Sequence, residues 1–202
     1  MSHNLALNLQ ISRSSIDNPI YTRRGSQFTL GLKITPPYSL IKGTTDAQYA
    51  QMTNSEKYNL LEYHKWRFSG KVFTPLSADS KLVLMARAEF GYLGHYNKNA
   101  KSPFESFYMG GDGMSSYSSY STEYVAMRGY QSGSLTPYDP ATGRNMGYVY
   151  NKFTMELRYP IALEQNATIW ALAFVEAGNC FADIKDYNPF NLKRSAGVGV
   201  RL

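Results

Sequence analysis

The chain has 202 residues, of which 43% are hydrophobic and 14% aromatic, and its formal net charge is +6. Its mean hydropathy is −0.38. No apolar run approaches the ~18 residues that a transmembrane helix needs, which excludes a helical membrane protein. The basic residues are scattered, without a basic run or a known binding motif, so we expect no nucleic-acid partner. The single cysteine, Cys180, excludes a disulfide scaffold.

The first half of the chain contains four segments in which apolar and polar residues alternate, the pattern of a strand with one apolar face. They cover about residues 5–14, 27–34, 60–74 and 81–94. In the second to fourth of these segments the apolar face carries the even-numbered residues, among them Phe28, Leu30 and Leu84. Residues 38–59 are polar, and we treat them as a loop in which residues 47–56 could form a short helix.

Three further segments follow a long break at residues 95–147 and cover about residues 148–159, 167–178 and 192–202. In the first of them the apolar residues Phe153, Met155 and Leu157 have odd numbers, so the phase changes across the break. Pro160 is predicted to end that strand. The segment 167–178 is apolar on both faces apart from Thr168 and Glu176, so its pattern does not determine its orientation.

The connections between these segments alternate in length. Residues 15–25, 75–80 and 160–166 are short connections, whereas 36–59, 95–147 and 179–191 are long. Because a tilted strand crosses the hydrocarbon layer in ~9 to 11 residues, each segment is long enough to do so. The pattern predicts an all-β antiparallel meander of a transmembrane barrel. Seven strands leave two unpaired edges, and bacterial single-chain barrels have even strand counts, so we expect the chain to be incomplete as a functional unit.

The break at 95–147 contains the most distinctive residues of the chain. Phe107, Gly110 and Gly111 are followed after a Ser/Tyr-rich insert by Met127-Arg128-Gly129-Tyr130. Loops this long in compact domains are usually functional or disordered, and we interpret this one as ordered.

The sequence contains no recognisable catalytic, phosphate-binding or metal-binding motif. The glycines lack the Lys-Ser/Thr of a phosphate-binding loop, and the serines at 115–121 lack a nucleophile elbow. The three histidines, His3, His64 and His95, are too far apart in sequence for a metal-ligand spacing. We therefore expect no enzyme activity, cofactor or metal.

The two loop stretches resemble the aromatic-x-x-Gly-Gly and aliphatic-Arg-Gly-aromatic signatures of the sixth extracellular loop in the BamA family. These are outer-membrane assembly and translocation barrels of the bacterial surface antigen superfamily. The insert from Asp112-Gly113-Met114 to Ala126 looks most like the Bacteroidota branch. The resemblance covers the whole chain. It implies that residues 1–202 are the C-terminal portion of a sixteen-stranded barrel, strands eight to fourteen. The periplasmic domains and the last two strands would be absent.

The same resemblance implies which residues matter. In the family the loop folds back into the lumen, and its arginine meets acidic residues on the two strands that follow. The matching residues here are Arg128, Glu156 and Glu176, with Gly129 allowing a close approach to the wall and Tyr130 packing beside it. An arginine can serve two carboxylates with the nitrogens of its fork.

The resemblance further implies a non-enzymatic function in the outer membrane of a Gram-negative bacterium: folding and inserting β-barrel proteins without ATP. The implied partners are outer-membrane lipid, lipoprotein subunits of the assembly machine and unfolded outer-membrane proteins. Alternatives are a two-partner-secretion or autotransporter-assembly translocator of the same superfamily, and a passive porin-like channel. A second role of the long loops in binding host molecules also stays open.

Overall fold

The computed structural model describes residues 2–97, 99, 101–113, 122–140, 142–164 and 167–202. Seven of its strands form one antiparallel sheet, in the order β1-β2-β3-β4-β9-β10-β11. Neighbours in this sheet follow one another along the chain, so the predicted meander is confirmed. The strands are β1 (Leu7–Ser14), β2 (Gly25–Ile34), β3 (His64–Pro75), β4 (Val83–Gly94), β9 (Val149–Glu164), β10 (Ala167–Phe181) and β11 (Lys193–Arg201).

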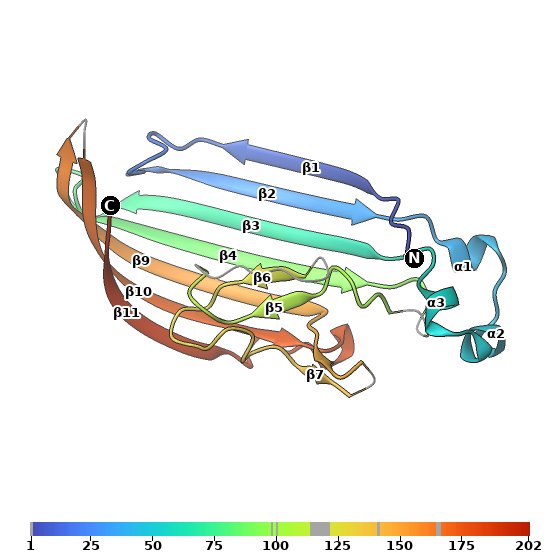
Figure 1. Cartoon of the computed structure of the whole chain (residues 1–202). Coiled ribbons are helices and arrows are strands. Elements are labelled where there is room, and N and C mark those ends of the chain that lie inside the picture. Colours follow the sequence, from blue (N-terminus) through green and yellow to red (C-terminus); the bar gives the residue numbers. More distant parts are fainter. Residues whose placement is uncertain (1, 98, 100, 114–121, 141, 165–166) are drawn as a thin grey trace.

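The sheet is curved, and the long loop between β4 and β9 lies against one of its faces (Figure 1). This loop contains the parallel pair β5 (Phe107–Met109) and β6 (Glu123–Val125) and the antiparallel pair β7 (Tyr138–Asp139) and β8 (Arg144–Asn145). We call the face that the loop covers the inner face and the opposite one the outer face.

Residues 38–59 contain three short helices, α1 (Tyr38–Ile41), α2 (Asp46–Gln51) and α3 (Asn54–Lys57). Helices α2 and α3 fall in and around residues 47–56, where the sequence left a short helix open, whereas α1 was missed. A reciprocal capping box between Thr45 and Gln48 starts α2.

One local prediction was wrong, because Pro160 does not end its strand. It pairs with Trp170 beside a register shift in β10. Proline cannot donate to the ladder, and such an irregularity is where a sheet tolerates it. The next strand, β10, also extends beyond its predicted end and includes the buried Cys180. The connection after it contains the short 3-10 helix η1 (Ile184–Asp186).

The outer face is apolar and exposed, whereas charged side chains lie on the inner face, several of them buried beneath the loop. Phe28 and Leu30 are 40% and 44% exposed, whereas Lys152 and Glu156, on the inner face, are 3% and 2% exposed. The odd-numbered Phe153, Met155 and Leu157 share the outer face with the even-numbered residues of β2 and β3. The predicted change of phase is thus confirmed. An apolar outside around a polar inside is the pattern of a membrane barrel.

Apolar cores lie on the inner side of the sheet. One joins the loop to the wall and includes Tyr63, Phe107, Met109, Met127 and Tyr150. The other lies near the short connections, with the side chains of Tyr21, Phe73, Val83, Met85, Trp170 and Leu172. Because of this second core, the inner face is not polar along its whole length. In the described parts of the chain, the helices are too short and too polar to span a membrane.

Candidate functional site: the loop against the inner wall

The Gly-Gly stretch builds a tight turn that joins the two halves of the long loop. The Gly110 N–H donates to the Val125 carbonyl at 3.0 Å, and the Met127 N–H donates to the Gly111 carbonyl at 2.9 Å. Gly110 and Gly111 have φ values of +127° and +85°. A Cβ on Gly110 would lie 2.3 Å from the Gln131 carbonyl oxygen. Glycine is therefore required there both by the backbone conformation and by the space available.

Apolar side chains on both motifs hold this turn onto the wall. Phe107, Met109 and Met127 are completely buried. The Phe107 ring packs edge-on against Tyr150 of β9, with the ring centroids 4.7 Å apart. Main-chain hydrogen bonds also join Phe107 and Gly147 in both directions. The residues on which the loop resemblance rested thus form the contact between loop and sheet.

Arg128 meets both of the acidic residues expected from the sequence. Its Nη2 donates to Glu156 Oε1 at 2.9 Å and to Glu176 Oε1 at 2.8 Å. Its backbone N–H donates to Glu176 Oε2 at 2.9 Å. The guanidinium carbon lies 3.5 Å from the centroid of the Phe174 ring. A single nitrogen, Nη2, serves both acids, and the guanidinium stacks on the Phe174 ring.

The two acids have further partners on the wall. Glu156 Oε2 accepts from Nε and Nη2 of Arg158 at 3.0 and 2.7 Å. Glu176 Oε1 lies 3.1 Å from Lys152 Nζ and 3.3 Å from the Thr154 hydroxyl. Lys152 Nζ also donates to the Ala126 carbonyl. Buried carboxylates are tolerable when paired and hydrogen-bonded in this way.

Gly129 and Tyr130 complete the contact on the side of β11. Gly129 has a φ of +86°, and a Cβ there would lie 3.2 Å from the Ser195 Cβ. The Tyr130 hydroxyl donates to the Arg194 carbonyl at 2.8 Å. The motif 127–130 therefore touches three consecutive strands of the wall: β9, β10 and β11.

Several members of this site were not singled out from sequence. Alternation places Lys152 and Arg158 on the same face as Glu156, which is a signal that could have found them. Phe174 could not be found in this way, because β10 is apolar on both faces. Residues 114–121 of the insert lie outside the described residues. Among the described residues, no group of His, Cys, Asp or Glu is arranged to hold a metal ion.

A curved antiparallel sheet with an apolar outer face, a charged inner face and a loop held against the inside is part of a transmembrane β-barrel wall. The model of the Omp85 superfamily domain matches residues 1–202, so the chain belongs to that superfamily.

Comparison with solved structures gives the same fold. The chain is similar to the crystal structure of BamA from Haemophilus ducreyi lacking POTRA domains 1–3, with a TM-score of 0.66 and 16% identity. The alignment covers 96% of this chain and 35% of the BamA chain. No curated protein matches the sequence.

Proposed function

We propose that this chain forms part of the barrel of an outer-membrane protein assembly factor of the BamA type. It would help fold and insert β-barrel proteins into the outer membrane without ATP and without enzymatic chemistry. Residues 1–202 would be the C-terminal portion of the barrel domain, lacking the last two strands and the periplasmic domains. Its origin would be a Gram-negative bacterium of the Bacteroidota branch.

The observation that carries this proposal is the bridge from Arg128 to Glu156 and Glu176. Around this bridge the loop is held to the wall by charge, by stacking and by a shared apolar core. Membership of the Omp85 superfamily supports a role in inserting or translocating proteins. Outer-membrane lipid meets the apolar face, and the proposed protein partners are lipoprotein subunits and unfolded outer-membrane proteins.

In this proposal the chain supplies wall and loop. Unfolded substrates would pair with strand edges, which is a form of β-augmentation. The seam between the first and last strands of the barrel would receive them, and both seam strands lie outside this segment. The loop residues then act on the shape and stability of the barrel rather than by touching a substrate.

Depletion of the native protein in its own bacterium tests the proposal. We expect many unrelated outer-membrane barrels to lose their heat-resistant folded forms together, while their unfolded precursors accumulate. Failure to export one secreted partner, with all other barrels intact, would instead identify a two-partner-secretion translocator. Loss of small-solute uptake alone would identify a porin.

Reconstitution separates insertion from indirect effects. Liposomes containing the native protein and its copurifying subunits should fold a urea-unfolded barrel protein faster than empty liposomes. The rate should be the same with and without ATP. Equal rates in loaded and empty liposomes would contradict the proposal.

A further inference from the structure

A second group of ion pairs holds the long loop at a different place on the wall. Glu105 lies two residues before β5, and Glu123 is the first residue of β6. The parallel pairing of β5 with β6 sets Phe107 opposite Glu123, and the Glu123 N–H donates to the Ser106 carbonyl at 2.9 Å. The two carboxylates are therefore placed together by the fold of the loop itself.

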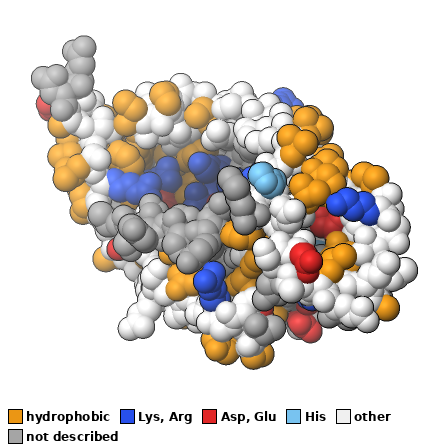
Figure 2. Space-filling view, turned by 45° about the vertical axis from the view of Figure 1, so that its right-hand side comes forward, with side chains coloured by type: hydrophobic (Ala, Val, Ile, Leu, Met, Phe, Trp, Pro, Cys, Tyr) orange, Lys and Arg blue, Asp and Glu red, His pale blue; other side chains and the backbone are white. Residues whose placement is uncertain are grey.

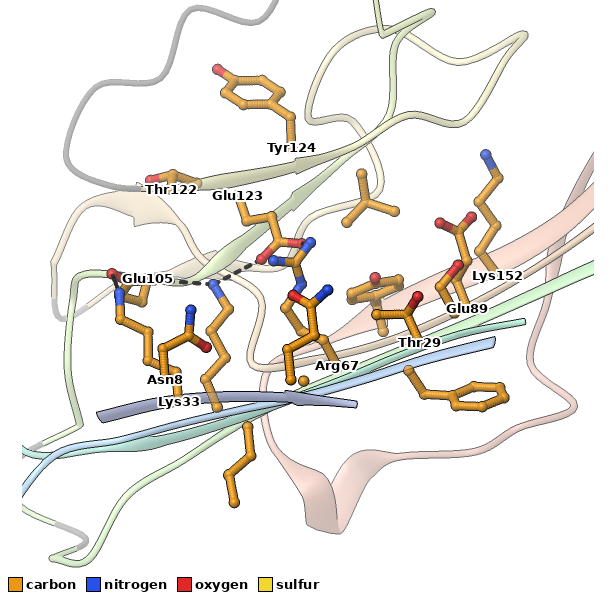
Figure 3. A pocket seen from close by; sticks show the side chains of 18 of the residues that line it. Asn8, Thr29, Lys33, Arg67, Glu89, Glu105, Thr122, Glu123, Tyr124 and Lys152 are labelled. Carbon is orange, nitrogen blue, oxygen red and sulfur yellow. Dashed lines mark hydrogen bonds and ion pairs between the residues drawn. The ribbon is translucent and has the colours of Figure 1, made fainter. Parts of the chain in front are cut away.

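Both carboxylates meet cations on β2 and β3. Glu105 Oε1 accepts from Lys33, and its Oε2 lies 3.3 Å from Lys65 Nζ. Glu123 Oε2 lies 2.9 Å from Lys65 Nζ, and its Oε1 lies 2.9 Å from Arg67 Nη2. Figure 3 shows Glu105 and Glu123 of the loop pointing towards Lys33 and Arg67 of the sheet.

Lys65 is the centre of the group. It is only 4% exposed, and its ammonium lies 4.8 Å from the centroid of the Phe107 ring. A buried ammonium is costly unless it is paired. Because Glu105 and Glu123 both approach it from the loop, lifting the loop would leave this cation without its two carboxylate partners.

The backbone of Glu105 gives an independent indication. Its φ is +68°, one of two positive values among the described non-glycine residues. Such a conformation is unfavourable for a glutamate and persists where the surroundings impose it. Here it accompanies a carboxylate that reaches Lys33 and Lys65 at once.

The two contact regions have opposite polarity. At β9 and β10 the wall supplies the acids Glu156 and Glu176 and the loop supplies Arg128, whereas at β2 and β3 the wall supplies cations and the loop supplies acids. A loop seated the other way round would place Arg128 opposite Lys33 and Lys65, and like-charge contacts of this kind disfavour a wrong arrangement.

We propose that Glu105 and Glu123 are positioning residues which, with Lys33, Lys65 and Arg67, form a second latch that fixes the orientation of the loop. The first latch, at Arg128, holds one side of the loop, and the second holds the other. This proposal is about the position of the loop on the wall. Any effect of the latch on protein assembly rests on the proposed function.

Cysteine labelling of the native protein in outer-membrane vesicles tests the latch. Val125 is next to the second latch and 6% exposed, so Val125→Cys reports whether the loop is seated. The natural Cys180 is replaced by alanine in every variant to remove its thiol. We expect Glu123→Lys to raise the rate of reaction with a small maleimide at least tenfold.

A conservative variant and a matched control complete the test. Glu123→Asp should keep at least half of the protection, because it retains a carboxylate that faces Lys65 and Arg67. Glu89→Gln should leave the rate within twofold, because Glu89 faces the same cavity but pairs with Arg87 of its own strand. If Glu123→Lys prevents folding, the double variant Glu105→Gln with Glu123→Gln is used in its place. Its labelling rate should also rise.

Labelling of Glu123→Lys and of the double glutamine variant at the unaltered rate, or labelling of Glu123→Asp as fast as of Glu123→Lys, would overturn the latch. Heat-resistant migration on a cold gel shows separately that each barrel is folded. The labelling result does not depend on which proteins the barrel assembles, so failure of the proposed function would leave it standing.

Discussion

At the scale of single residues, Arg128 is used in three ways at once. Its backbone N–H and its Nη2 both donate to Glu176, its Nη2 also reaches Glu156, and its guanidinium face covers the Phe174 ring. A lysine ammonium could reach the acids but could not stack in this way. The choice of arginine is therefore explained by the ring as much as by the carboxylates.

Replacing Arg128 should destabilise the folded barrel. A broken buried pair costs ~3 to 5 kcal/mol, and we expect about 3 kcal/mol here. The cost lies at the lower end of that range because the Arg128 side chain is 23% exposed and because Lys152 would still pair with Glu176. Urea titration of the native protein in detergent measures this change.

Comparison of Arg128→Lys with Arg128→Ala tests the stacking contribution. Arg128→Lys should lose most of what Arg128→Ala loses, whereas Arg24→Lys at an exposed turn should change the unfolding free energy by less than ~0.5 kcal/mol. Full stability of Arg128→Lys would show that charge alone holds the loop.

The pairing of Glu105 predicts a dependence on pH. Burial alone would raise the pKa of the Glu105 carboxyl, but the hydrogen bond from Lys33 and the charge of Lys65 outweigh it and lower the pKa. A carboxyl whose folded pKa is depressed stabilises the fold above its unfolded pKa. That contribution disappears as the pH falls through the folded value.

Labelling of Val125→Cys over a pH series measures the effect, with each rate corrected for the thiolate fraction. Protection should be constant down to the ordinary glutamate range near pH ~4.3 and fall below it. Glu105→Gln should show weaker protection throughout and a smaller change with pH. Identical pH profiles for the two proteins would contradict the assignment to Glu105.

The sequence predicted the pairing of Arg128 with Glu156 and Glu176. It did not predict the pairing of Glu105 with Lys65. Arg128, Glu156 and Glu176 came from a motif and a resemblance. Glu105 carries no motif, and its meeting with Lys65 depends on how β5 and β6 pair after a long insert. Long-range pairing of this kind leaves no periodic signal in the sequence, so only the structure shows it.

At the scale of elements, the glycines of the loop differ in what they permit. Gly110 and Gly143 both have positive φ values, but a Cβ on Gly143 meets nothing within 4 Å. Gly143→Ala should therefore cost only the backbone strain, ~1 to 2 kcal/mol. Gly110→Ala adds a clash with the Gln131 carbonyl and should unseat the loop.

Protease sensitivity of the loop in the folded native barrel distinguishes these two variants. We expect cleavage within the loop for Gly110→Ala and resistance for Gly143→Ala. Equal resistance would mean that the Gly-Gly turn is not needed for seating.

The two faces of β2 give a second prediction at this scale. Leu30 is on the outer face near the middle of the strand, and its neighbour Thr29 lines the inner cavity. Leu30→Arg should destabilise the native protein in lipid by ~2 to 4 kcal/mol, because it places a charge in the hydrocarbon layer. Thr29→Arg should cost much less, and equal costs measured by urea unfolding in vesicles would refute the assignment of faces.

Alternation predicted the strands and their faces well because one face meets lipid and the other meets charge. Alternation gave wrong predictions where an apolar core lies on the inner face or where the strand register is irregular. Trp170 and Met85 belong to an apolar core on the inner side, so the inner face is not uniformly polar. Pro160 was predicted to end its strand, but β9 continues through it beside a register irregularity.

At the scale of the whole molecule, the sheet is open. In the described parts of the chain, β1 and β11 each pair with one strand, and both edges present exposed apolar side chains such as Leu9 and Val198. Unpaired edges of this kind promote strand addition or aggregation. The 202-residue chain refolded alone in detergent should therefore give no compact, protease-resistant monomer with heat-resistant migration, and such a monomer would contradict the open sheet.

A crosslink in the native outer membrane tests whether the loop is seated on the inner wall. The Tyr130 hydroxyl contacts the backbone of β11 at Arg194, and the neighbouring Ser195 side chain faces Gly129 of the loop. Tyr130→Cys with Ser195→Cys, in a Cys180→Ala background, should therefore be joined efficiently by a short bis-maleimide. Tyr130→Cys with Ser12→Cys, on the strand at the other end of the sheet, should not. Absence of the first crosslink in folded protein, or equal yields for the two pairs, would show that the loop is not held where Arg128, Glu156 and Glu176 place it.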